Sequence, residues 1–90
     1  GPVPGNTAIA IKSLVKAMNG AKTASKKYWK TVFGKDYTGK PAAMSRAFNR
    51  AIKELIDNGV VLTEQDTYRF GDYAACPWTD IRDYLPSTAS

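Results

Sequence analysis

Histidine is absent from this chain, and cysteine occurs once, at Cys76. Without histidine there is no Ser-His-Asp or Cys-His nucleophile and no imidazole ligand for a metal ion. One cysteine can form neither an intrachain disulfide nor a cysteine-based zinc site. The phosphate-binding motifs G-x-x-x-x-G-K-[ST] and G-x-G-x-x-G are missing as well. We therefore expect no catalytic residue, no metal ion, no cofactor and no enzymatic activity.

Long hydrophobic runs are also missing, since no stretch approaches the roughly 18 consecutive apolar residues of a membrane span. The chain does not open with a charged segment followed by an apolar one, so we expect no signal peptide. Together with the single cysteine, this predicts a cytoplasmic or nuclear protein that is not secreted and has no membrane partner. Residues 1–5 are interpreted as the disordered remnant of a cleaved tag, outside the fold.

Acidic residues are scarce in the first part of the chain. Residues 1–53 hold 11 of the 13 lysines and arginines but one acid, Asp36, which gives a net charge of +10. Residues 54–90 hold seven acids against Arg69 and Arg82, a net charge of −5. A basic segment of this size is typical of proteins that bind a polyanion, most often nucleic acid. Lysines that only keep the surface soluble are the alternative explanation.

The spacing of apolar residues predicts three helices in one small domain. The first helix is capped by Asn6 or Thr7 and carries Ser13 on its polar face. The second begins at Ser25 and ends at Gly34, and the third runs from about residue 41 to residue 58. The apolar face of the first helix consists of Ile9, Ile11, Leu14, Val15 and Met18. Those of the other two consist of Tyr28, Trp29, Val32 and Phe33, and of Met44, Ala47, Phe48, Ala51, Ile52, Leu55 and Ile56.

A β signature follows the third predicted helix. Residues 60–62 and 67–70 read as two strands of a hairpin with a polar turn over residues 63–66, and residues 22–24 as a third, edge strand. In the tail, Trp78, Ile81 and Leu85 share one face of a short predicted helix. We predict an α+β, mainly α fold: a winged helix-turn-helix of three helices, a β-hairpin wing and a short C-terminal helix. Residues 6–72 form the domain, and residues 73–90 form a C-terminal extension.

The polar face of the third predicted helix, about residues 41–58, has the residue types that recognise duplex DNA in the major groove. Arginine bonds guanine and asparagine bonds adenine in bidentate fashion, while serine and lysine suit phosphates. Free N–H groups at the helix start add the positive end of its dipole. Lysines of the second helix would flank the groove, whereas the wing turn is acidic. The predicted DNA-binding residues are Lys26, Lys27, Lys30, Lys40, Ser45, Arg46, Asn49, Arg50, Lys53 and Arg69.

Two other functions stay open at this point. The acidic wing and the tail residues Trp78, Ile81 and Leu85 would suit a protein-interaction module if those apolar side chains are exposed. Binding of single-stranded nucleic acid would need aromatic rings exposed beside lysines, for which Tyr28 and Tyr37 are the candidates.

Residues 29–70 resemble a C-terminal winged-helix segment of some phage and plasmid replication proteins that carry a helicase or primase-helicase domain. The pattern covers about half the chain, contains no catalytic motif and has no counterpart to the tail beyond Gly71. The resemblance implies a domain of a larger replication protein that engages origin or template DNA through Ser45, Arg46, Asn49, Arg50 and Lys53. The residues that carry it are Trp29, Phe33, Arg46-Ala47-Phe48-x-Arg50-Ala51, Leu55, Gly59-Val60-Val61, Asp66 and Tyr68.

Overall fold

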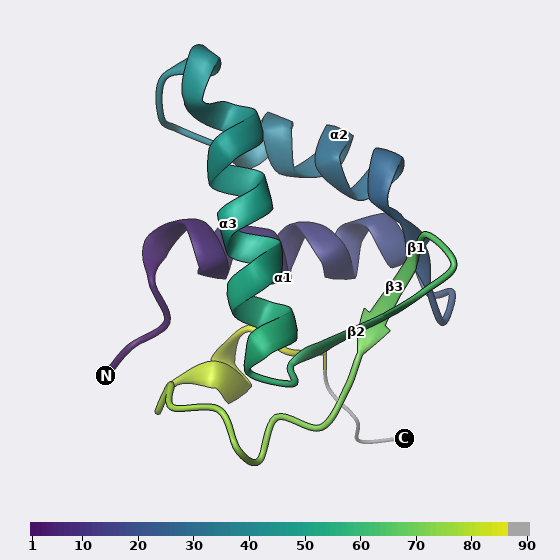
Figure 1. Ribbon diagram of the computed structural model, residues 1–90, viewed down its shortest axis with the longest axis vertical. Helices are drawn as coiled ribbons and strands as arrows, with labels where there is room; N and C mark the ends of the chain where they lie inside the picture. Colours follow the sequence, from purple (N-terminus) through teal and green to yellow (C-terminus); the bar gives the residue numbers. More distant parts are fainter. Residues whose placement is uncertain (87–90) are drawn as a thin grey trace.

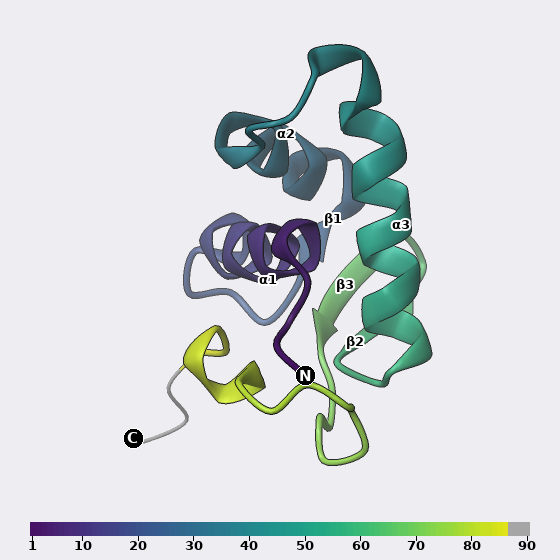
Figure 2. The same ribbon diagram turned by 90° about the vertical axis from the view of Figure 1, so that its left-hand side faces the viewer.

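The computed structural model describes residues 1–86, which form a mainly helical α+β fold, as predicted. Within this part of the chain, three α-helices combine with a three-stranded antiparallel sheet. Figures 1 and 2 show α1 and α2 on the same side of α3, with the sheet beside its C-terminal half. In chain order the elements are α1 (Gly5–Met18), β1 (Ala24–Ser25), α2 (Lys26–Asp36), α3 (Met44–Asp57), β2 (Val61–Glu64) and β3 (Thr67–Phe70).

The sheet has the strand order β1-β3-β2, so β3 lies between two antiparallel neighbours. β2 and β3 form the predicted hairpin, but the turn is shorter than residues 63–66, because Glu64 still pairs with Thr67. Gln65 and Asp66 complete the turn with φ angles of 49° and 64°. Two left-handed residues give the connection the twist that paired strands require. The edge strand was predicted over residues 22–24, but β1 covers Ala24–Ser25, where Ala24 pairs with Tyr68 of β3.

α1 begins before its predicted caps. Pro4 precedes the helix, and Asn6 and Thr7 lie within the first turn, so neither of them is the cap. Ser13, predicted on the polar face, is instead completely buried. The reason is the packing of α2, which brings the polar edge of Trp29 against this side of α1. The buried residues of α1 are Thr7, Ala8, Ala10, Ile11, Ser13, Leu14 and Ala17.

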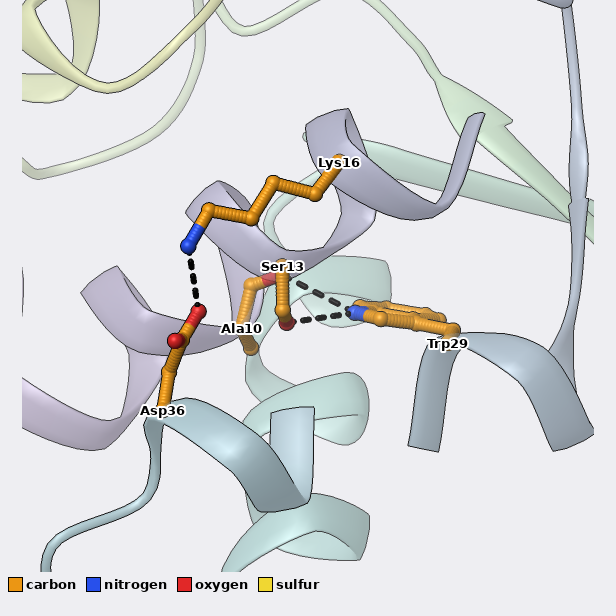
Figure 3. A network of polar contacts seen from close by, with 5 residues as sticks. All are labelled: Ala10, Ser13, Lys16, Trp29 and Asp36. Atoms are coloured by element: carbon orange, nitrogen blue, oxygen red, sulfur yellow. Dashed lines mark hydrogen bonds and ion pairs between the residues drawn. The ribbon is translucent and has the colours of Figure 1, made fainter. Parts of the chain in front are cut away.

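Trp29 joins the three helices inside the core. Its Nε1–H donates to Ala10 O at 3.0 Å and to Ser13 Oγ at 3.1 Å (Figure 3). The Ser13 hydroxyl donates in turn to Ala10 O at 3.0 Å, so each polar atom of this buried group has a partner. The indole ring also meets Phe48 of α3 edge-on, with centroids 5.2 Å apart and planes at 84°. Trp29 and Phe33 of α2, which both pack on Phe48, therefore help to hold α3 against the other two helices.

α2 begins at its predicted cap, because Ser25 Oγ accepts a hydrogen bond from Tyr28 N at 3.1 Å. It does not end at Gly34, which lacks the left-handed conformation that terminates many helices. The helix continues to Asp36, whose carboxylate lies 2.8 Å from Lys16 Nζ of α1 (Figure 3). This exposed ion pair connects the end of α2 to α1.

A 3-10 turn over Pro41–Ala43 leads into α3, which ends at Asp57, close to the predicted range of 41–58. Gly59 follows with a φ of 74°, as its position after the helix requires. The buried side chains of α3 are Phe48, Ala51, Ile52 and Leu55, with Met44, Ala47 and Ile56 half-buried beside them. One face of α3 thus packs in the core, and the opposite face lies in solvent.

The start of the chain packs against the tail, which differs from our expectation that residues 1–5 are disordered and lie outside the fold. Val3 is 6% exposed, and its N–H donates to Asp80 Oδ1 at 2.8 Å. Thr79 N donates to Gly1 O at 3.1 Å. Figure 2 shows the tail passing beside the N-terminus below α1. The burial of an apolar valine accounts for this docking.

The tail, from residue 73 onward, contains one 3-10 turn, Ile81–Asp83, among its described residues instead of the predicted helix. The segment between Pro77 and Pro86 is too short for a cooperative helix. Trp78 and Ile81 are 8% and 5% exposed, and Leu85 packs half-buried against the core. The last part of the predicted extension, residues 87–90, lies outside the described residues.

Candidate nucleic-acid interface

The outward face of α3 carries half of the predicted DNA-binding residues. α3 lies along one side of the molecule, with α1 and α2 to its left in Figure 2. Because its buried residues recur every three or four positions, the residues between them face away from the core. Five predicted side chains on this helix are exposed: Ser45, Arg46, Asn49, Arg50 and Lys53.

Charge divides α3 into two halves. Arg46 and Arg50 lie in the first half, and Glu54 and Asp57 lie in the last turns. Lys53 Nζ is 2.8 Å from Asp57 Oδ2, and the hydrogen bond and the charge of that carboxylate raise the pKa of Lys53. Lys53 is therefore protonated but paired with an acid. The unopposed positive charge of the helix is concentrated on Arg46 and Arg50.

The two arginines line an open groove between the start of α1 and α3, which we call the α1–α3 groove. It has a volume of about 360 Å³ and is lined by one edge of α3, by the first turn of α1 and by the loop after α2. Tyr37 of that loop stacks on Phe33, with ring centroids 5.7 Å apart. The lining residues are Pro4, Asn6, Thr7, Tyr37, Ala43, Arg46, Ala47, Arg50, Ala51 and Glu54.

The predicted lysines of α2 line a second groove of about 440 Å³, the α2–wing groove. Lys26, Lys27 and Lys30 lie there beside Ser25 and Asp66. Asp66 belongs to the wing turn, and its carbonyl oxygen accepts a long hydrogen bond from Lys26 N at 3.4 Å. No residue of α3 lines this groove, so the structure does not bring the lysines of α2 and the arginines of α3 into one pocket.

Lys40 and Arg69 lie outside both grooves. Lys40 is exposed, and its carbonyl oxygen accepts a hydrogen bond from Ala43 N at 2.9 Å at the start of the 3-10 turn. Arg69 is exposed on β3, opposite Leu62 of β2, which is 39% exposed. Both side chains are accessible, but neither is held in a position that selects a ligand.

The start of α3 offers fewer free N–H groups than expected. Pro41 has no N–H, and the N–H groups of Ala43 and Met44 donate to Lys40 O and Pro41 O within the 3-10 turn. The start of α1 is open instead, since Pro4 supplies no side-chain cap. The first turn of α1 and Tyr37 are not among the predicted DNA-binding residues, although both line the α1–α3 groove. The lack of an acid or a usable cap at residues 4–7 is the sequence signal that points to the former.

Trp78 and Ile81 are buried against the core, so they do not form the exposed apolar stripe that the protein-interaction alternative requires. Of the two tyrosines considered for single-stranded nucleic acid, Tyr28 is 54% exposed on α2, whereas Tyr37 is half-buried against Phe33. One exposed ring provides a single stacking surface, which is less than the successive platforms typical of single-strand binders.

Within residues 1–86, no group of three or more acidic, cysteine or histidine residues is placed to hold a metal ion. In the same range, no helix combines the length and the apolar character needed to cross a membrane. Comparison of the chain with protein-family models, curated proteins and solved structures finds no match. The candidate interface is therefore described from its own residues: the exposed first half of α3, the α1–α3 groove and the separate α2–wing groove.

Proposed function

We propose that this chain is a winged-helix domain that binds duplex DNA through α3. The order of its elements and the antiparallel β1-β3-β2 sheet support the winged-helix assignment. The observation that carries the DNA-binding proposal is the outward side of α3. There, Ser45, Arg46, Asn49 and Arg50 are all exposed over the first half of the helix. The two ion pairs among residues 1–86 involve none of these four.

In this proposal α3 enters the major groove with its first turns leading. Arg46, Asn49 and Arg50 contact base edges, because guanidinium and carboxamide groups match the acceptor and donor pairs of guanine and adenine. Ser45 and Lys53 contact the backbone, as do Lys26, Lys27, Lys30 and Lys40, and these phosphate contacts position the protein without reading sequence. The acidic wing turn stays out of the groove, and Arg69 supplies the one backbone contact from the wing. The resemblance to replication proteins extends the proposal to a domain that engages origin or template DNA.

Fluorescence anisotropy with a labelled duplex at about 50 mM and 200 mM salt tests the proposal, because phosphate contacts release counterions and make affinity fall with salt. In this proposal six cations contact the backbone: Lys26, Lys27, Lys30, Lys40, Lys53 and Arg69. If all six contact phosphates, log K changes with log salt with a slope of about −5. A duplex affinity that does not change with salt concentration, or no binding at low salt, contradicts the proposal.

A charge-matched control separates a defined interface from a general attraction to a basic protein. Arg46→Ala and Arg50→Ala each remove one positive charge from α3. Arg82→Ala removes one from the tail, where Arg82 lies 5.9 Å from the Tyr73 ring. The proposal predicts that the two α3 variants lose affinity and Arg82→Ala does not. An unlabelled single strand that competes as well as the duplex would favour the single-strand alternative built on Tyr28.

A further inference from the structure

The first turn of α1 offers backbone N–H groups that have no acceptor within the helix. Its first backbone bond runs from Ala8 N to Pro4 O at 2.8 Å, which leaves the N–H groups of Gly5, Asn6 and Thr7 available. Pro4 has no side-chain group that could cap them, and no acidic residue lies in this turn. The positive end of the α1 dipole therefore borders the α1–α3 groove. The carboxylate of Asp80 accepts from Val3 N, two residues before the helix, and is not part of the groove lining.

Thr7 provides separate evidence for a ligand in this groove. Thr7 is 4% exposed, and its hydroxyl takes part in no hydrogen bond within residues 1–86. In that part of the chain, no side-chain oxygen is both sealed from the surface and without a partner. Thr7 Oγ1 therefore has some contact with the surface, and Thr7 lines the α1–α3 groove. A nearly buried hydroxyl on the lining of a groove with two arginines is placed to donate to an anion.

The opposite wall of the groove supplies the charge. Arg46 and Arg50 lie one helical turn apart on α3, and neither takes part in the two ion pairs of the described residues. Glu54 lies one turn further along the same wall, and it is the one carboxylate of the lining. The groove thus has an arginine-lined end that attracts an anion and an acidic end that repels it.

We propose that the α1–α3 groove binds one phosphate group. The N–H groups of the first turn of α1 and Thr7 Oγ1 hold it. Arg46 and Arg50 each direct part of their five N–H donors to it, which leaves the other donors for base edges. A helix N-terminus, a hydroxyl donor and guanidinium forks together complement the oxygens of a phosphate. The source of that phosphate rests on the proposed function: if α3 binds duplex DNA, a backbone phosphate fills the groove and sets the register of α3 on the duplex. A free or terminal phosphate is the other source.

The direct test is a titration of the full ¹⁵N-labelled chain with inorganic phosphate at constant ionic strength, with acetate as the comparison anion. We expect saturable shifts of the amides of residues 5–7 with phosphate and not with acetate. Thr7→Val keeps the size of the side chain but removes the hydroxyl, and should weaken binding about tenfold. Thr7→Ser keeps the hydroxyl and should restore binding. Thr63→Val, on the exposed part of β2, is the matched control.

Glu54→Gln gives a change of opposite sign on an exposed residue, so it tests the site even if substitution of the buried Thr7 impairs folding. Removing the one carboxylate of the lining should tighten phosphate binding about two- to threefold. The proposal is overturned by a lack of saturation, by an equal response to acetate, by equal behaviour of Thr7→Val and Thr7→Ser, or by weaker binding in Glu54→Gln.

Duplex DNA then identifies the source of the phosphate. If the backbone fills the groove, Thr7→Val lowers affinity by the same factor for all duplex sequences. If Thr7→Val weakens phosphate binding but leaves duplex affinity unchanged, the phosphate site stands, and a free or terminal phosphate is its ligand. If the wild-type chain saturates with phosphate but binds no duplex, the DNA-binding proposal fails and the phosphate site stands.

Discussion

The ion pair between Lys53 and Asp57 allows a quantitative test of α3 as the DNA-binding helix. Lys53 Nζ lies 2.8 Å from Asp57 Oδ2 on the exposed face of the helix. To contact a phosphate, Lys53 must leave this carboxylate, so Asp57 competes with DNA for the lysine. Asp57→Asn removes the competing charge and keeps the shape of the side chain. We therefore expect this variant to bind duplex DNA more tightly than the wild-type chain.

The size of the effect follows from counterion release. Each phosphate contact changes the slope of log K against log salt by about 0.9. Complete release of Lys53 would then change the ratio of variant to wild-type affinity about 3.5-fold between about 50 mM and 200 mM salt. Asp57 raises the pKa of Lys53 above 10.5, so its removal lets that pKa fall back toward 10.5. Lys53 is protonated at neutral pH in both proteins, and the gain comes from the lost competitor rather than from a change of protonation.

A double-mutant cycle of Lys53→Ala and Asp57→Asn measures this coupling by anisotropy. Lys53→Ala should cost little in the wild-type chain and more in the Asp57→Asn background. Equal costs in the two backgrounds, or an Asp57→Asn variant with unchanged affinity and slope, would refute the reasoning. Thermal unfolding is the control: an acid in the last turn opposes the helix dipole, so Asp57→Asn should not lower Tm.

Three further predictions concern the interface, the core and the hairpin. Arg50→Ala should cost about 1–3 kcal/mol of binding on a preferred duplex, whereas an equal loss on all sequences would identify a phosphate contact. Trp29→Phe removes the indole donor to Ser13 and leaves a cavity, and should lower the free energy of unfolding by about 2–4 kcal/mol in urea; a loss below 1 kcal/mol would contradict the packing described. Replacing Gln65-Asp66 by Asn-Gly should raise the free energy of unfolding by about 1 kcal/mol, because both positions have a positive φ; a lower stability would count against that turn geometry.

Local signals in the sequence predicted most of the elements. Pro41 and Gly59 mark the helical segment that contains α3, and Ser25 caps α2, because these residues act on the backbone next to them. Long-range packing was predicted less well. Ser13 has the spacing of a solvent-facing residue. Its burial is explained by Trp29 of α2, which packs against it and donates a hydrogen bond to its hydroxyl. A sequence pattern records which residues are polar, but it does not record which polar groups find a partner inside the core.

The candidate site shows the same limit. The polar face of α3 follows from helical periodicity, so the exposure of Arg46 and Arg50 was predictable. The position of Thr7 beside that face could not be predicted, because this position depends on how α1 packs against α3. The tail was misread for a related reason: Trp78 and Ile81 have helical spacing, yet burial against the core fixes them without a helix.

The division of charge along the chain has a structural consequence for DNA binding. The basic part of the sequence ends at Lys53 and the acidic part begins at Glu54, so the boundary falls within α3. A helix laid flat along the major groove would bring Glu54 and Asp57 close to phosphates, which costs electrostatic free energy. Tilting α3 so that its first half enters the groove avoids that cost and brings the α1–α3 groove toward the backbone. Glu54 lines that groove and so stays close to the phosphate within it. We therefore expect Glu54→Gln to increase duplex affinity at low salt and to lose this advantage at high salt, because screening removes the repulsion. An unchanged affinity at low salt would contradict a DNA phosphate in the α1–α3 groove.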